Sequence, residues 1–128
     1  MNYYVTIAAF LAVAATLGHF MIGCKQFMQP VLDSEVDIIP KKVMHSLFHY
    51  MSMYMIITSI ALLSFAFCPY IKLRFSMDIV FFIGISYAGF AIAQFFIALT
   101  SGIPGGVFKL FQWVFWLLIA FFSLWATC

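Results

Sequence analysis

The stretch that decides the fold runs from residue 3 to residue 24 and reads YYVTIAAFLAVAATLGHFMIGC. It contains no Asp, Glu, Lys or Arg. At about 1.5 Å per residue, a helix of this length crosses a hydrocarbon core of about 30 Å. Because lipid offers no partner to a free backbone amide, such a tract must be helical. No basic region precedes it, so we expect a retained first helix and not a cleaved signal peptide.

Three more apolar tracts continue this pattern: Val43–Phe67, Ile79–Leu99 and Val107–Ala126. The chain of 128 residues is 66% hydrophobic, 20% aromatic and only 8% charged, with a mean hydropathy of +1.13. A soluble domain carries about 25% charged residues, so this composition indicates an integral membrane protein.

The short connections between the tracts imply antiparallel neighbours. We therefore predict an all-α fold with four transmembrane helices in an up-down-up-down antiparallel bundle, as a single transmembrane domain over residues 1–128. Pro30 is expected to stop the first helix, and Pro40 with Lys41 and Lys42 suits the start of the second. The expected helices cover residues 3–28, 41–67, 78–100 and 107–127.

The basic residues give an orientation in the membrane. Four lysines lie on the side of the first and third loops, whereas Lys72 and Arg74 lie on the other side. The excess of Lys and Arg marks the cytoplasmic side, so we expect the first and third loops to be cytoplasmic. The four lysines are Lys25, Lys41, Lys42 and Lys109.

Polar side chains gather at one depth of the predicted bundle. The first and third helices run toward the face of the first and third loops, and the second and fourth start from it. Counting residues from the helix ends, five polar side chains lie within about two turns of that face. Their convergence predicts a polar pocket and a cofactor-binding site. These residues are His19, His45, His49, Gln94 and Gln112.

The sharpest interpretation of this pocket is a metal or haem site. His45 and His49 are at i and i+4, so they share one helix face, and His19 lies on a neighbouring helix. Three imidazoles suit zinc, copper or iron, and nearby methionines favour copper. Alternatively, His19 and one histidine of the second helix hold a haem b as axial ligands. The leading functional hypothesis is therefore metal handling or electron transfer.

Other interpretations of the same residues stay open. The pocket also suits a quinone or a lipid, with His45 or His49 as acid or base in a membrane enzyme. A third hypothesis is an accessory subunit without catalytic activity, whose partners are membrane lipid and a homo-oligomer or larger membrane complex. The histidines and glutamines can also form a purely structural polar network. A net charge of +2, with scattered basic residues, gives no indication of nucleic-acid binding.

Several classes of protein are excluded by missing motifs. The first tract has no carboxylate of the kind that a small multidrug antiporter needs, and the spans lack the Glu and Arg of membrane glutathione-transferase-like enzymes. The three cysteines lie far apart without a Cys-x-x-Cys pair, and no His-Glu-x-x-His motif is present.

The order of these motifs resembles a group of small, uncharacterised bacterial inner-membrane proteins with four helices. The resemblance rests on Gly18-His19 with Gly23, then on Pro30-Val-Leu, and then on His45 and His49 at the opening of a second span. It covers mainly residues 18–52. It implies a bacterial inner-membrane location and a four-helix topology, and it implies no activity.

Overall fold

The structure is a computed structural model that describes residues 2–68 and 76–128, and these are almost entirely helical, with no strand among them. Lys72 and Arg74, on which the predicted orientation depends, lie outside the described residues. The elements are α1 (Tyr3–Gly18), the π-helix η1 (His19–Met28), α2 (Gln29–Asp33), α3 (Ile38–Phe67), α4 (Ser76–Thr100), α5 (Gly106–Lys109) and α6 (Gln112–Trp125).

Three helical stretches are long and apolar enough to cross a membrane: Tyr3–Asp33, Ile38–Phe67 and Ser76–Thr100. The prediction of an all-helical fold is confirmed, and these stretches are compatible with a membrane protein. α6 has only 14 residues, whereas a crossing helix needs about 20. By length, the described residues thus support three spans.

Two helix boundaries differ from the prediction. The first helix does not stop before Pro30: Pro30 lies at the junction where η1 gives way to α2, and the helix runs on to Asp33. The fourth helix is interrupted: Leu110, with φ −102° and ψ 52°, separates α5 from α6. The sequence shows no proline or glycine at this break.

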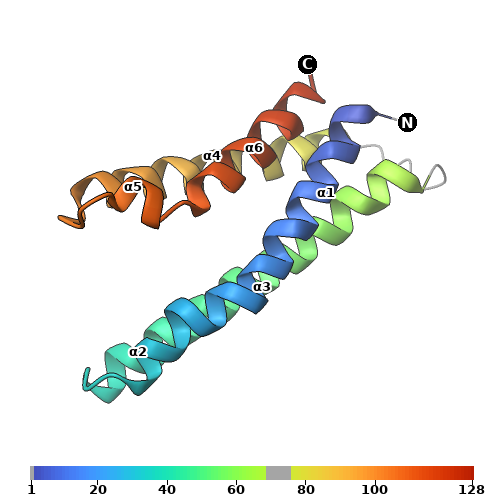
Figure 1. Cartoon of the computed structure of the whole chain (residues 1–128). Coiled ribbons are helices and arrows are strands. Elements are labelled where there is room, and N and C mark those ends of the chain that lie inside the picture. The colour runs from blue at the N-terminus through green and yellow to red at the C-terminus, as the bar shows by residue number, and fades with distance from the viewer. Residues whose placement is uncertain (1, 69–75) are drawn as a thin grey trace.

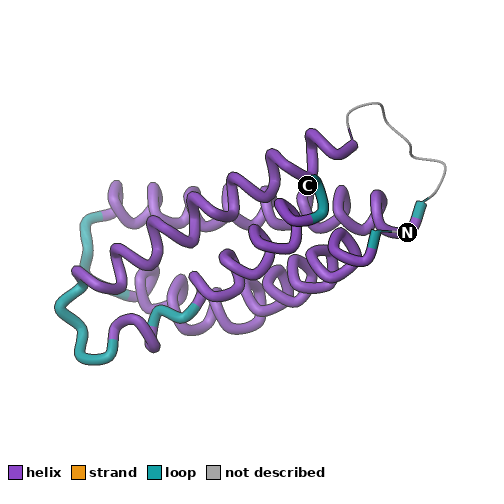
Figure 2. The backbone as a smooth tube through the Cα atoms, turned by 90° about the horizontal axis from the view of Figure 1, so that it is seen from above, coloured by secondary structure: helices purple, strands orange, loops and turns teal. Residues whose placement is uncertain are grey.

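The helices form two antiparallel hairpins. α1 and η1 pack against α3, while α4 packs against α6, and α1 joins the hairpins through α6. The helices run lengthwise, with most connections at the two ends of the molecule (Figure 2). The hairpins meet at the end that carries both termini and diverge toward α2 and α5 (Figure 1).

Small side chains let the helices approach at the end where the hairpins meet. Ala8, Ala9 and Ala12 are fully buried, and they form part of the same core as Leu62 of α3 and Ile119 of α6. Small residues favour close packing between helices in lipid, where no hydrophobic effect drives association. Asn2 links the start of α1 to the end of α6, because its side chain accepts from the N–H of Tyr4 and donates to the carbonyl of Ala126.

A polar contact joins α1 to α3 halfway along the hairpin. Thr16 Oγ1 donates to the Ala12 carbonyl at 2.7 Å and lies 3.0 Å from Ser59 Oγ, which is buried. We expect Thr16→Val to lower the free energy of unfolding by about 0.6–1.7 kcal/mol, the range for hydrogen bonds between membrane helices. Unfolding by SDS in mixed micelles would measure it.

The matched control is Thr6→Val on the same helix. The described hydrogen bond of the Thr6 hydroxyl goes to the Asn2 carbonyl within its own helix end. Thr6→Val should therefore lower the free energy of unfolding clearly less than Thr16→Val, which removes the contact with Ser59. Equal costs for the two variants would contradict an interhelical role for Thr16.

Candidate functional site

A cleft of about 410 Å³ is lined by residues of both hairpins. The hairpins diverge toward this end of the molecule (Figure 1). One wall comes from α1 and η1, together with Phe48 of α3. The other comes from Gln94 of α4 and from the start of α6. Most of its lining is apolar, with five aromatic side chains: Phe27, Phe48, Phe111, Phe115 and Trp116.

Three of the five polar residues singled out in the sequence line this cleft: His19, Gln94 and Gln112. Each of the three side chains is half-buried. They come from three different elements, η1, α4 and α6, which reach the same depth because α4 ends and α6 begins near the same face. The cleft is therefore apolar with a few convergent polar groups, as small-molecule sites generally are.

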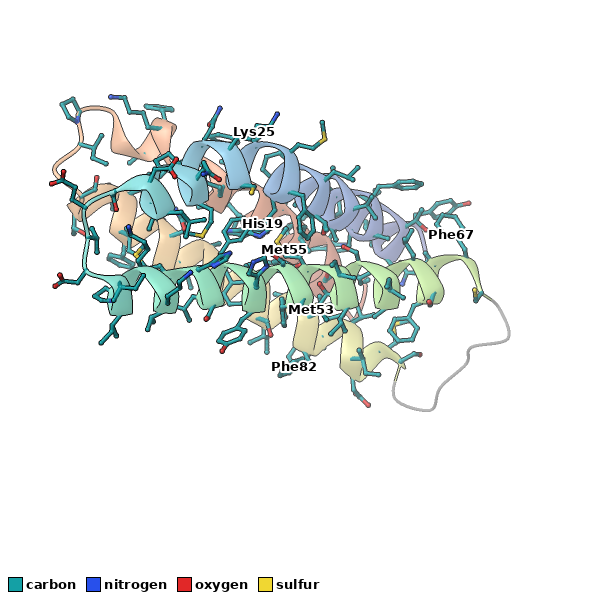
Figure 3. The ribbon with its side chains drawn as sticks, turned by 90° about the horizontal axis from the view of Figure 1, so that it is seen from below. His19, Lys25, Met53, Met55, Phe67 and Phe82 are labelled. Carbon is teal, nitrogen blue, oxygen red and sulfur yellow. The ribbon has the colours of Figure 1, made fainter. Side chains whose placement is uncertain are left out.

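His19 is held in one orientation by α3. Its ring lies between α1 and α3 (Figure 3) and stacks on Phe48, with ring centroids 4.1 Å apart and an interplanar angle of 19°. Its Nε2 lies 2.8 Å from Ser52 Oγ, and Ser52 Oγ in turn donates to the Phe48 carbonyl at 2.9 Å. Ser52 thus accepts from His19, which assigns the proton of the neutral ring to Nε2.

The second ring nitrogen of His19 faces Gly23, another residue of the cleft lining. A Cβ built on Gly23 would lie 3.7 Å from His19 Nδ1. With the proton on Nε2, Nδ1 carries a lone pair and is a hydrogen-bond acceptor. The ring nitrogen of His19 that Ser52 does not engage is therefore an acceptor, and it lies beside Gly23.

Gln112 presents an acceptor that is not satisfied. Its Oε1 is buried and has no hydrogen-bond partner among the described residues. Buried polar atoms are nearly always paired, and an unpaired one needs an explanation. Gln112 is the first residue of α6, so the break after α5 sets its position beside the cleft.

His45 and His49 lie outside the cleft lining. Their Nε2 atoms are 3.0 Å apart, with His49 exposed and His45 half-buried. Among the described residues, no group of three His, Cys, Asp or Glu side chains is disposed to hold a metal ion. The three-histidine metal site and the haem accordingly stay predictions without support from this geometry.

The π-helical geometry of η1, which forms one wall of the cleft, could not be predicted from the sequence. η1 is a π-helix of 10 residues, and it supplies His19, Ile22, Gly23 and Phe27 to the cleft. π-helical turns are usually short and occur frequently at functional sites. The aromatic lining from Phe111 and Phe115 was also missed, although Phe115 lies three residues after Gln112 and therefore on the same helix face.

No family model, curated protein or solved structure matches this chain.

Proposed function

We propose that this protein is an integral membrane protein whose cleft binds a lipophilic molecule bearing hydrogen-bond donors, such as a hydroxylated lipid or a quinol. The observation that carries the proposal is the cleft itself, an apolar cavity with five aromatic side chains and the polar residues His19, Gln94 and Gln112 in its lining. Gln112 Oε1 is buried without a hydrogen-bond partner among the described residues, and a rotation of the amide would bring it to the cleft. An unsatisfied buried acceptor costs about 1–3 kcal/mol. A ligand hydroxyl that donates to it recovers this free energy.

The acceptor on His19 supports the same ligand class. His19 and Gln112 belong to opposite hairpins and both line the cleft. Two acceptors on opposite walls suit a molecule with two donors, as in a diol or a hydroquinone. The stack on Phe48 and the hydrogen bond to Ser52 hold the imidazole before the ligand arrives, so little side-chain entropy is lost on binding.

The size and lining of the cleft suit an apolar body. A volume of about 410 Å³ lies within the usual range for small-molecule pockets, about 300–1,000 Å³. Phe27, Phe111 and Phe115 supply flat apolar surfaces against which a ring or an acyl chain can pack. Such a ligand can enter from the bilayer, because the hairpins diverge toward this end (Figure 1).

The proposal includes a membrane arrangement. We infer that α1, α3, α4 and α6 all cross the bilayer, with α5 and the segment up to Phe111 extending the short α6. The connections at the cleft end are cytoplasmic, because the lysines at that end outnumber the basic residues at the other. The ligand then binds near the cytoplasmic leaflet of a bacterial inner membrane.

The test is to identify the lipophilic molecules that stay bound when the protein is purified in mild detergent. Mass spectrometry of the extract should find about one equivalent of a hydroxylated lipid or quinol in the wild type. In Gln112→Leu and in His19→Ala, we expect affinity to fall about tenfold, the effect of roughly 1.4 kcal/mol. Readdition of a short-chain quinol, followed by quenching of tryptophan fluorescence, to which Trp116 in the cleft lining contributes, gives the dissociation constant.

Gln26→Leu is the matched control, since Gln26 is an exposed residue of η1 outside the cleft lining. It makes the same chemical change and should leave ligand content and affinity unchanged. The proposal fails if Gln112→Leu retains the wild-type affinity, or if the wild type holds no lipophilic donor molecule.

The accessory-subunit hypothesis stays a prediction with its own test. If the chain serves a larger membrane complex, one partner protein should purify with it at a fixed ratio. The same preparation can therefore decide between a ligand-binding protein and a subunit without a ligand.

A further inference from the structure

Two histidine nitrogens converge on the surface of α3, away from the cleft. His45 and His49 are one helical turn apart, their ring centroids are 4.7 Å apart, and the rings are tilted by 53°. The approach is between the two Nε2 atoms, at 3.0 Å. Neither residue lines the cleft, so the pair is independent of the ligand site proposed above.

We propose that His45 and His49 form a two-nitrogen chelating site for a late transition metal, bound most tightly as Cu²⁺. Metal–imidazole bonds are about 2.0–2.1 Å long. Two such ligands at angles of about 90–110° have nitrogens roughly 2.8–3.4 Å apart, and the separation of 3.0 Å in this pair falls within that range. The order of stability of divalent metals places copper first for nitrogen ligands.

The tautomers of the two rings are compatible with this site. Without metal, one Nε2 carries a proton and donates it to the other. With metal, both Nε2 lone pairs point at the ion, and the proton of each neutral ring sits on Nδ1. No net proton needs to leave, because the donor ring only changes tautomer.

The coordination sphere is open. No third His, Cys, Asp or Glu of the described residues joins the pair. His19 is on the neighbouring helix, but its Nε2 is engaged by Ser52. The remaining positions go to water or to a small external ligand, so this site differs from the three-histidine site expected from the sequence.

The experiment uses the full chain in detergent, purified without a histidine tag and titrated with Cu²⁺ alone. We expect about one equivalent to bind at a free concentration of about 10 µM. Electron paramagnetic resonance should show nitrogen couplings from two imidazoles. His45→Ala and His49→Ala should each weaken binding by about tenfold or more and leave one imidazole signal, since a chelate loses one of its two nitrogens.

A matched control keeps the histidine count and breaks only the geometry. In His49→Ala combined with Tyr50→His, the second imidazole moves to i+5, off the shared face, at a position that is 67% exposed. This variant should bind copper as weakly as His49→Ala, with an unchanged circular dichroism spectrum. His19→Ala should bind as the wild type does.

Either of two results overturns the site. Wild-type copper affinity in His45→Ala would place the metal elsewhere. A loss in His19→Ala equal to that in His45→Ala would show a three-histidine site instead.

Discussion

Replacing Tyr87 with alanine should destabilise the protein by about 3–5 kcal/mol, the usual cost of truncating a buried large side chain. Tyr87 lies in α4 and is fully buried. Its hydroxyl is 2.8 Å from Thr58 Oγ1 of α3, and its ring lies 5.5 Å from that of Trp116 in α6. The hairpins are joined mainly through α1 and α6, and Tyr87 adds a second link, between α3 and α4, which share few other contacts. SDS-induced unfolding would measure the change.

Tyr87→Phe separates the hydroxyl from the ring. It keeps the packing on Trp116 and removes only the hydrogen bond to Thr58, so the expected loss is about 0.6–1.7 kcal/mol. The ring also lies 5.7 Å from that of Tyr54 in α3, across the hairpins. If alanine and phenylalanine cost the same free energy of unfolding, these ring contacts contribute nothing and the inferred role is wrong. A loosened inter-hairpin contact in Tyr87→Ala should also weaken ligand binding in the cleft, because the two walls belong to different hairpins.

The helices themselves could be predicted from the sequence because one physical constraint dominates. Apolar tracts of about 20 residues leave the backbone no alternative to helix, and the ends of α3 and α4 fall within three residues of the expected ones. The divergence of the hairpins could not be predicted. It follows from side-chain volumes: buried alanines of α1 lie where the hairpins meet, while Phe111, Phe115 and Trp116 line the open end.

The depth of the site's polar residues could be predicted from the sequence, but the rotation of α3 about its own axis could not. Counting residues from the helix ends is enough to bring His19, Gln94 and Gln112 to one level. The spacing of His45 and His49 fixes that they share a face, yet not where that face points. In the structure the buried residues of α3 include Ser52, Met55 and Ser59, and Met55 points toward α1 (Figure 3). Because α3 is rotated in this way, His49 is exposed.

Gly84→Val should lower the free energy of unfolding by about 3 kcal/mol, at the upper end of the usual range for overpacking. Gly84 of α4 is buried against α6, in the hairpin with the most extensive packing. A Cβ at this position would lie 2.8 Å from Leu124 Cγ and 3.2 Å from the Leu124 backbone nitrogen. The leucine side chain can rotate away, but the backbone cannot, so α4 and α6 must separate.

Gly89→Val distinguishes this steric effect from a change in helix propensity. Gly89 lies in the same helix, is exposed, and has no atom within 4 Å of a built Cβ. Both substitutions alter the intrinsic preference for helix equally, so the difference between the two variants isolates the contact with Leu124. Gly84→Val combined with Leu124→Ala should recover only part of the loss, because removing the leucine side chain leaves the approach of the backbone nitrogen unchanged. Full recovery would mean that the side chain alone sets the helix separation, and a Gly84→Val protein as stable as Gly89→Val would show that the helices do not approach this closely.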